Sequence, residues 1–294
     1  MNLKSTTMLN ILVTGSDGQL GSSIKEYKNV YPNYNFIFAS QNVFDITRVD
    51  NCFLKQNSIN TVINCAAYTA VDAAENNQIK ADLVNHTGVL NLALAAKEAG
   101  AKFVHISTDY VFDGKHYKPY TETDRVSPLS IYGKTKLAGE NALINCTLKN
   151  SIIIRTAWLY SEFGKNFLKT MLNLAETKKN LKVVSDQTGT PTYASDLAHT
   201  ILEILPLIQN DKTQIYHYSN EGAASWYDFA WTIMKEANLP CKIEPVNSIE
   251  YQTAVQRPFF SLLDKRKIKS EYGINIPHWR ESLDKCLRKM GVKI

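Results

Sequence analysis

The chain has 294 residues, of which 44% are hydrophobic and 21% charged, so it is long enough to bury one large core or two moderate ones. Its net charge of +5 is small for this length and no basic cluster stands out, which argues against a nucleic-acid partner. No apolar run approaches the ~20 residues that cross a bilayer, and residues 1–10 contain no apolar leader segment, so we expect a cytoplasmic protein without a membrane partner.

The first predicted strand, residues 10–14, runs directly into a glycine-rich loop. Gly15, Gly18 and Gly21 follow one another at intervals of three residues and open a helix. In this context the first glycine permits a tight turn, the second lets the backbone approach a pyrophosphate, and the third allows close helix–strand packing. The positive end of the helix would then face phosphate charge. The pattern favours dinucleotide binding over a turn that needs glycine only for its geometry.

The second predicted strand, residues 35–39, bears on which dinucleotide binds. An acidic side chain at its tip would bind the adenosine ribose hydroxyls and favour NAD. Here the tip carries Ser40 and Gln41, and the first acid is Asp45, several residues later. These neutral residues present no charge barrier to a 2′-phosphate, although no arginine is adjacent to bind one. We therefore expect NADPH as the cofactor, with NADH left open.

Three more short apolar strands follow, at residues 61–64, 102–107 and 151–155, with a long or broken helix over 73–99 that Gly100 closes. Short apolar strands that alternate with helices predict an α/β fold, a Rossmann-type doubly wound parallel sheet with right-handed crossovers. Between the last two strands, a serine followed by a proline at 127–128 predicts the start of another helix.

On that helix Tyr132 and Lys136 lie four residues apart, so both side chains emerge on one face. A free tyrosine titrates near pH ~10, and a neighbouring ammonium should lower its pKa. A phenol tuned in this way can protonate a carbonyl oxygen as hydride arrives at its carbon. The pair alone is a weak signal, because tyrosine and lysine often share an exposed helix face.

The second half is less regular. We expect helices over 166–178, 195–208, 225–238 and 277–290, and strands over 182–184, 214–217 and 242–244. We assign residues 1–160 to a NAD(P)-binding Rossmann domain and residues 161–294 to a smaller, interleaved C-terminal substrate-binding lobe. Segments near 185–220 are candidates for return to the first domain. The five cysteines and six histidines are dispersed without metal-ligand spacing, so we expect reduced thiols and no metal site.

Four segments that occur in this order carry a resemblance to a known family: the glycine loop, the turn at 64–72, residues 107–114 and the Tyr132–Lys136 pair. The chain resembles the extended short-chain dehydrogenase/reductase superfamily. Within it, segments 155–160, 186–192 and 257–261 are similar to the dTDP-4-dehydrorhamnose reductase family. The resemblance covers nearly the whole chain. It implies a dTDP-sugar substrate and reduction of the 4-keto group of dTDP-4-dehydro-L-rhamnose by NAD(P)H, giving dTDP-L-rhamnose.

The resemblance also implies roles for individual residues. Tyr132 would be the proton donor, Lys136 would hold the nicotinamide ribose, and Thr108 would hydrogen-bond the substrate carbonyl. The implied substrate contacts are Thr108, Asp109, Trp158 and, for the nucleotide diphosphate, Arg257. The implied cofactor contacts are Gly15, Gly18, Gln19, Leu20, Gly21, Asp45, Ile46, Ala67, Tyr68 and Thr69. Two positions depart from the family pattern: Phe260 stands where the family has asparagine, and Tyr68 stands where some members have histidine.

Three alternatives stay open at this point. A nucleotide-sugar epimerase would share the fold and retain its cofactor. A dehydratase would need an Asp-Glu pair after the catalytic hydroxyl, but Thr108 is followed by Asp109 and Tyr110. A non-catalytic NADP-binding regulatory subunit, similar to that of methionine adenosyltransferase, would not need the Thr108, Tyr132 and Lys136 set. A homodimer is compatible with all of these functions.

Overall fold

The computed structural model of the chain describes residues 8–50, 52–251 and 255–293. The N-terminal stretch in which we expect no leader segment lies almost entirely outside these ranges. Within them, no helix combines the length and the apolarity that crossing a bilayer requires.

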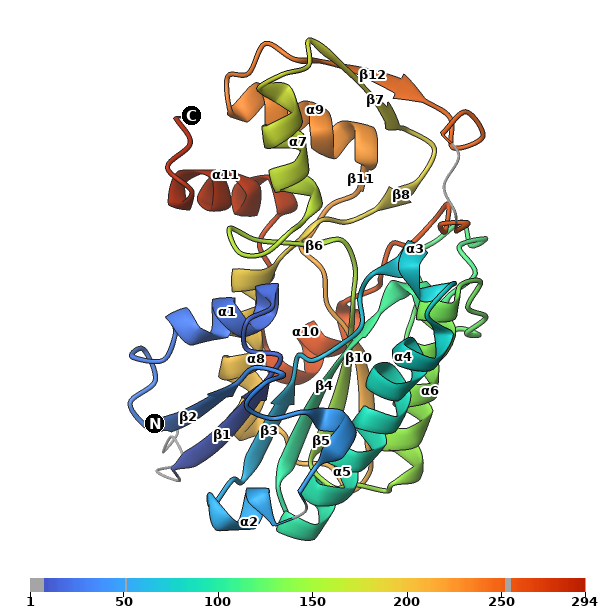
Figure 1. Cartoon of the computed structure of the whole chain (residues 1–294). Helices are drawn as coiled ribbons and strands as arrows, with labels where there is room; N and C mark the ends of the chain where they lie inside the picture. The colour runs from blue at the N-terminus through green and yellow to red at the C-terminus, as the bar shows by residue number, and fades with distance from the viewer. Residues whose placement is uncertain (1–7, 51, 252–254, 294) are drawn as a thin grey trace.

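The centre of the molecule is a six-stranded sheet in which every pair of neighbouring strands is parallel (Figure 1). The strand order is β10-β5-β4-β3-β1-β2. The strands are β1 (Leu9–Thr14), β2 (Tyr34–Ala39), β3 (Thr61–Asn64), β4 (Lys102–Thr108), β5 (Ser151–Thr156) and β10 (Gln214–His217). The predicted Rossmann-type parallel sheet is therefore confirmed.

Both faces of the sheet are covered by helices. One face packs against α1 (Gln19–Glu26), α8 (Ala194–Ile204) and α10 (Arg266–Tyr272), and the other against α2 (Phe53–Gln56), α5 (Gly88–Ala99) and α6 (Ile131–Asn145). Side chains alternate along each strand, so Ile11 and Val13 of β1 enter the first core and Leu12 enters the second. This arrangement explains why β1 reads as a continuous apolar run.

The helix predicted over residues 73–99 is interrupted once, at residues 75–77, and is continuous from 78 to 99 with a π-helical turn inside it. Its segments are α3 (Val71–Ala74), α4 (Gln78–Asp82), a π-helical segment (Leu83–Thr87) and α5. Asn85, inside the π-helical segment, is fully buried and bonds both backbone polar groups of Tyr68, at 2.8 and 3.1 Å. The π-helical segment therefore anchors the loop that follows β3. Gly100 closes α5 with a φ of 67°, as its position predicts.

The predicted start of the next helix at Ser127 is wrong. Helix α6 begins three residues later, with Ser130 as its N-cap, whose hydroxyl accepts from the Gly133 N–H at 3.1 Å. Ser127 is still in an extended connection, and its N–H bonds the Val111 carbonyl. The residues on the helix keep the expected spacing, so Tyr132 and Lys136 share one face.

The second half of the chain builds a smaller layer around a third core. Its helices are α7 (Phe167–Ala175), α9 (Trp226–Glu236) and α11 (Trp279–Lys289), and its strands are β6 (Leu159–Tyr160), β7 (Asn180–Val184), β8 (Thr188–Gly189), β9 (Thr192–Tyr193), β11 (Ala224–Ser225) and β12 (Lys242–Val246). Figure 1 shows this layer above the carboxyl ends of the large sheet. Helices α8 and α10, also from the second half, pack on the large sheet, and β10 is its edge strand next to β5.

Candidate active site

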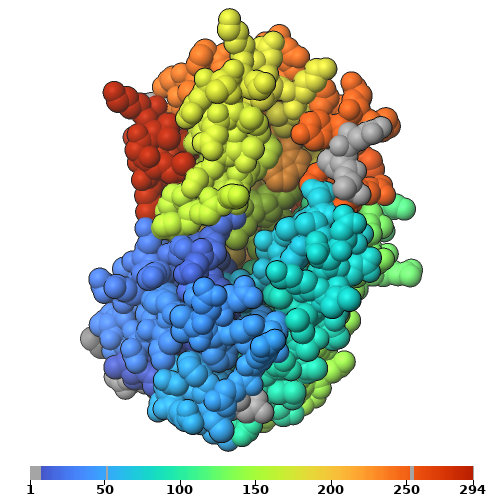
Figure 2. Space-filling model, in the orientation of Figure 1, coloured from blue at the N-terminus to red at the C-terminus, as the bar shows by residue number. Residues whose placement is uncertain are grey.

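A cleft of about 1320 Å³ opens at the carboxyl ends of β1, β3, β4 and β5, beneath the second-half layer. In Figure 2 the surface is hollowed between the blue and cyan first half of the chain and the yellow-green and orange segments. In open α/β sheets the carboxyl edge is where ligands bind. The cleft contains all the predicted catalytic and substrate residues and seven of the ten predicted cofactor residues: Thr108, Tyr132, Lys136, Asp109, Trp158, Arg257, Gly15, Gly18, Gln19, Leu20, Gly21, Ala67 and Thr69.

The glycine loop needs glycine for close backbone approach. Gly15 has a φ of 63°, and a Cβ there would lie 2.7 Å from the Ala66 Cα. At Gly21 a Cβ would lie 2.5 Å from the Gly15 carbonyl oxygen. Gly18 stands at the N-cap of α1 with no side chain to occupy the helix end. The N-terminus of α1 is therefore open to the cleft, in the geometry that suits a phosphate group.

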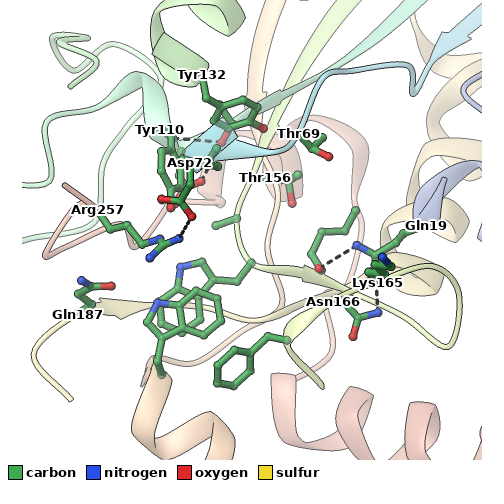
Figure 3. Close-up of a pocket in the computed structure, with 18 of the residues that line it drawn as sticks. Gln19, Thr69, Asp72, Tyr110, Tyr132, Thr156, Lys165, Asn166, Gln187 and Arg257 are labelled. Atoms are coloured by element: carbon green, nitrogen blue, oxygen red, sulfur yellow. Dashed lines mark hydrogen bonds and ion pairs between the residues drawn. The ribbon is translucent and has the colours of Figure 1, made fainter. Parts of the chain in front are cut away.

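Gln19 ties this loop to the second-half layer (Figure 3). Its amide nitrogen donates to the Leu159 carbonyl at 3.3 Å, and its Oε1 accepts from Ser161 and Asn166 at 3.0 and 2.9 Å. Asn166 in turn caps α7 by accepting from the Lys169 N–H. The first turn of α1 and the first turn of α7 are thus held together across the cleft.

Three predicted cofactor residues do not line the cleft: Asp45, Ile46 and Tyr68. Asp45 caps the short 3₁₀ helix Ile46–Arg48 by accepting from the N–H and hydroxyl of Thr47, at 2.9 and 2.8 Å. Ile46 is buried against α5, so closely that a Cβ on Gly88 would lie 2.8 Å from its side chain. The backbone of Tyr68 is bonded by Asn85. Each of the three residues therefore has a local structural role, and their contact with a cofactor stays a prediction.

Tyr132 is partly buried in the wall of the cleft, and this changes its proton chemistry. Burial raises the pKa of Tyr132 to about 12, against the lowering effect of a hydrogen bond with Thr108; the nearby Asp109 raises it further. Lys136 is not among the groups that shift it. The prediction that Lys136 lowers the pKa of Tyr132 is therefore wrong for the protein alone. A raised pKa keeps the phenol protonated at neutral pH, which is the state that a proton donor needs.

Lys136 is buried with its ammonium group tied to β4. Only 2% of the residue is exposed, and Nζ donates to the Ile106 carbonyl at 2.7 Å and lies 3.4 Å from His105 Nε2. Burial lowers its pKa to about 8, while Glu140 and Cys65 act in the opposite direction. The lysine is thus held rigidly and titrates much closer to neutrality than a free lysine.

A buried ion pair lies next to the predicted catalytic residues. Arg155 donates to both carboxylate oxygens of Glu140, at 2.9 and 2.7 Å, and Ser107 donates to Oε1 at 2.5 Å. The guanidinium also lies over the Phe112 ring, 5.1 Å from its centre. Glu140 was not among the predicted site residues. Its spacing of four residues from Lys136 on α6 was the available signal, because it places the two side chains on one face.

Asp109 presents a carboxylate in this enclosed place. Its Oδ1 accepts from the Thr108 hydroxyl at 3.1 Å, and its Oδ2 has no hydrogen-bond partner among the described residues. Burial raises the pKa of Asp109 to about 6, against the lowering effect of the nearby Ser261 and Thr108 hydroxyls. An unpaired buried oxygen of this kind is suited to accept a hydrogen bond from a hydroxyl group of a ligand.

Trp158 belongs to an aromatic wall on the other side of the cleft. Its ring stacks on Trp226 with 3.6 Å between centroids and 9° between planes, and Phe167 leans on Trp226 at 4.6 Å. The backbone of Trp158 has a φ of 48°, a strained value for a bulky residue, and a Cβ on Gly189 would lie 2.6 Å from the indole. Tight packing therefore holds Trp158 in one orientation.

Arg257 reaches across the mouth of the cleft. Its Nη2 pairs with Asp72 of α3 at 2.9 Å, and Figure 3 shows the two side chains facing each other. Arg257 also hydrogen-bonds Tyr110. The guanidinium lies where it could meet an anionic ligand, but in the free protein it is paired with a carboxylate.

The described part of the chain contains no group of three or more histidine, cysteine, aspartate or glutamate side chains that could hold a metal ion.

The doubly wound sheet, the glycine loop after β1, and the threonine, tyrosine and lysine gathered at the carboxyl edge define the class of short-chain dehydrogenase/reductase folds. The family described as RmlD substrate binding domain matches residues 9–292. The chain belongs to this family.

Similar proteins support this assignment. The chain is 44% identical over 286 residues to the spore coat polysaccharide biosynthesis protein SpsK of Bacillus subtilis, covering 96% of this chain and 98% of that protein. It is 41% identical over 288 residues to the dTDP-4-dehydrorhamnose reductase of Aggregatibacter actinomycetemcomitans, covering 94% and 97%. Among solved structures, the dTDP-4-dehydrorhamnose reductase of Clostridium acetobutylicum has a TM-score of 0.91 at 41% identity, covering 96% and 100%. That of Bacillus anthracis, in complex with NADP, has a TM-score of 0.90 at 34% identity, covering 96% and 100%.

Proposed function

We propose that this protein is an NAD(P)H-dependent oxidoreductase that reduces the 4-keto group of dTDP-4-dehydro-L-rhamnose, giving dTDP-L-rhamnose. The observation that carries the proposal is the match to reductases of that name along almost the full length of both chains, at up to 41% identity. The Thr108, Tyr132 and Lys136 set, at the edge of the sheet where such a fold binds ligands, supports a catalytic role.

The glycine loop fits a dinucleotide, because side chains are absent where the backbone must approach the diphosphate. Gly15, Gly18 and Gly21 would hold the diphosphate together with the N-terminus of α1. When bound, the reduced nicotinamide supplies hydride. We propose NADPH, since Ser40 and Gln41 place no acid at the tip of β2 and a relative was solved with NADP. NADH stays an open alternative.

In this proposal Tyr132 delivers a proton to the developing alkoxide oxygen. Its raised pKa keeps the proton on the phenol until the oxygen becomes basic. The Thr108 hydroxyl, which donates to Asp109 in the free protein, would turn to donate to the same substrate oxygen. Lys136 would supply positive charge and hold the nicotinamide ribose. Because Thr108 and Lys136 are buried and held by hydrogen bonds before reaction, they would stabilise charge at the reacting oxygen with little rearrangement.

Substrate binding is assigned to Thr108, Asp109, Trp158 and Arg257. The unpaired oxygen of Asp109 would accept a sugar hydroxyl, and the rigidly held Trp158 would pack on an apolar sugar or base face. Arg257 would exchange its contact with Asp72 for the nucleotide diphosphate. Asp45, Ile46 and Tyr68 are retained as proposed cofactor contacts of the adenosine side.

The alternatives are less favoured. A dehydratase would need the Asp-Glu pair that is absent after Thr108. An epimerase, or a regulatory subunit like that of methionine adenosyltransferase, has no counterpart among the relatives described above. The division into residues 1–160 and 161–294, a homodimer, a cytoplasmic location and the absence of nucleic-acid partners stay predictions.

The test is NADPH oxidation with a panel of dTDP-, UDP- and GDP-linked 4-keto sugars. Rapid, stoichiometric consumption with dTDP-4-dehydro-L-rhamnose is the expected result. Conversion of a sugar without net NADPH consumption would favour an epimerase. No turnover on any sugar nucleotide, together with stoichiometric capture of a large partner enzyme, would favour the regulatory subunit.

A further inference from the structure

A line of buried polar side chains crosses three strands of the large sheet and ends at Lys136. Thr14, Asn64 and His105 are register partners on the neighbouring strands β1, β3 and β4. All three are fully buried. His105 and Ser107 on β4 face Lys136 and Glu140 on α6, one turn apart, so the line continues onto the catalytic helix. The function described so far uses neither Asn64 nor His105.

The contacts of Asn64 fix which end of its amide faces the histidine. Its Oδ1 accepts from the Thr14 hydroxyl at 2.7 Å and from the Ala66 N–H at 3.2 Å. A backbone N–H can only donate, so this end of the amide is the oxygen. The Nδ2 group therefore faces His105 Nδ1, at 3.2 Å, and donates to it.

The tautomer of His105 follows from this contact. Complete burial lowers its pKa well below the ordinary value, and the charge of Lys136 lowers it further, so the ring is neutral. A neutral imidazole carries one proton, and Nδ1 is occupied as an acceptor, so the proton is on Nε2. This Nε2–H group points at Lys136 Nζ, 3.4 Å away.

An ammonium group has no lone pair to accept this hydrogen bond, whereas a neutral amine has one. We propose that His105 is a positioning residue that stabilises the neutral amine form of Lys136 through its Nε2–H group. Nζ would then donate to the Ile106 carbonyl and accept from His105. The inference rests on the proposed function only where it concerns turnover.

Other groups around Lys136 act on the same equilibrium. Glu140, on the same helix, favours the ammonium form, but its own charge is paired with Arg155. Cys65, beyond β3, also favours the ammonium form. Tyr132 lies one turn earlier on α6. Burial is the largest cause that lowers the pKa of Lys136. In the proposal, His105 acts in the same direction as burial, from β4, and Glu140 opposes both.

The test measures the proton affinity of Lys136 directly. The full chain is labelled with ¹³C at lysine Cε and titrated by NMR, with Lys136→Arg to assign the signal. His105→Asn keeps an acceptor for Asn64 at the Nδ1 position and removes the donor toward Lys136, whereas His105→Gln places an amide nitrogen near the Nε2 position. We expect the proton affinity of Lys136 to rise about threefold to tenfold in His105→Asn, the range of one hydrogen bond, and to stay near wild type in His105→Gln. Equal shifts in both variants, or none, would overturn the proposal.

A second variant covers the case in which His105→Asn does not fold. Asn64→Asp still accepts from Thr14 and Ala66, and it would also accept from His105 Nδ1–H, which moves the ring proton away from Nε2. The new negative charge raises the proton affinity of Lys136 whichever residue stands at position 105. The effect of Asn64→Asp is therefore measured twice, once with His105 present and once in the His105→Gln variant. A larger rise in the proton affinity of Lys136 in the His105 background supports the tautomer argument, and equal rises contradict it.

Turnover gives an independent reading. If the ammonium form of Lys136 is needed, the alkaline limb of kcat should move to higher pH in His105→Asn and stay in place in His105→Gln. A purely structural role of His105 would lower kcat in both variants without moving the limb. Absence of turnover in the wild type would count against the proposed function and would leave the NMR titration unaffected.

Discussion

The ion pair between Glu140 and Arg155 lies beneath the cleft, with side chains only 1% and 3% exposed. Glu140→Leu would leave the guanidinium buried without its counter-charge. One partner removed from a buried, bidentate pair costs about 3–5 kcal/mol, so we expect a loss of that size in the free energy of unfolding. Arg155 has little alternative, because its Nη1 already lacks a partner among the described residues.

Removal of both charges should be far less costly than removal of one. In Glu140→Leu/Arg155→Met the desolvation cost of the two ions disappears together with their attraction, so we expect a stability within about 1–2 kcal/mol of wild type. The double variant should not reach the full stability of the wild type, because the Ser107 hydroxyl then has no carboxylate to donate to.

The assay is urea unfolding followed by circular dichroism, for the wild type, the single variant and the double variant. Asp284→Leu serves as the control, because Asp284 pairs with Arg288 on the exposed side of α11 and should change stability by less than about 1 kcal/mol. A loss below about 1 kcal/mol for Glu140→Leu, or a double variant no more stable than the single one, would refute the reasoning.

Three further predictions concern the cleft. Gly15→Ala forces a Cβ to within 2.7 Å of Ala66 at a positive φ, so NADPH titrated by fluorescence should bind at least about tenfold more weakly; unchanged affinity would show that the loop does not hold the cofactor. Burial raises the pKa of Asp109 from 3.8 to about 6. The folded state therefore holds this proton more tightly than the unfolded chain does. The resulting stabilisation is present at low pH and is lost as the pH rises through about 6. Asp109→Asn should therefore lose less stability than wild type between pH 4 and 7, by up to about 3 kcal/mol in urea unfolding, and parallel pH profiles would contradict the assignment. Arg257→Ala should raise KM for the sugar nucleotide about tenfold or more while Asp72→Asn, which frees the guanidinium, should not; equal KM values would remove Arg257 from the binding site.

The sheet could be predicted because its signal is local. Each strand is a short apolar run, and β1 passes directly into the glycine loop, so both fold class and loop follow from neighbouring residues. The start of α6 could not be placed in the same way. Ser127 and Ser130 are both good caps, and the choice between them depends on the contact of the Ser127 N–H with Val111, which is a tertiary contact.

The candidate catalytic residues could be predicted from spacing and resemblance, but their proton chemistry could not. The expected effect of Lys136 on Tyr132 treats the pair as if it lay on an exposed helix. In the structure the dominant effect on Tyr132 is burial, which depends on every element that closes the cleft.

The buried polar contacts beneath the site could not be predicted from the sequence either. Glu140 and Arg155 are fifteen residues apart and lie on different elements, and His105 is one of six dispersed histidines for which the sequence predicts no role in the site. Their contacts arise because α6 packs against β4 and β5. No local sequence pattern predicts which residues of the helix lie opposite which residues of the strands.

The measurement that tests the account most directly is the rate of NADPH oxidation by Tyr132→Phe with dTDP-4-dehydro-L-rhamnose. Loss of the proton donor should lower kcat by about 10²- to 10⁴-fold while the affinity for NADPH stays near wild type. Tyr110→Phe is the matched control, because its ring lies 5.5 Å from that of Tyr132 and it should keep most of kcat. Full activity in Tyr132→Phe would contradict the central claim that this phenol delivers the proton.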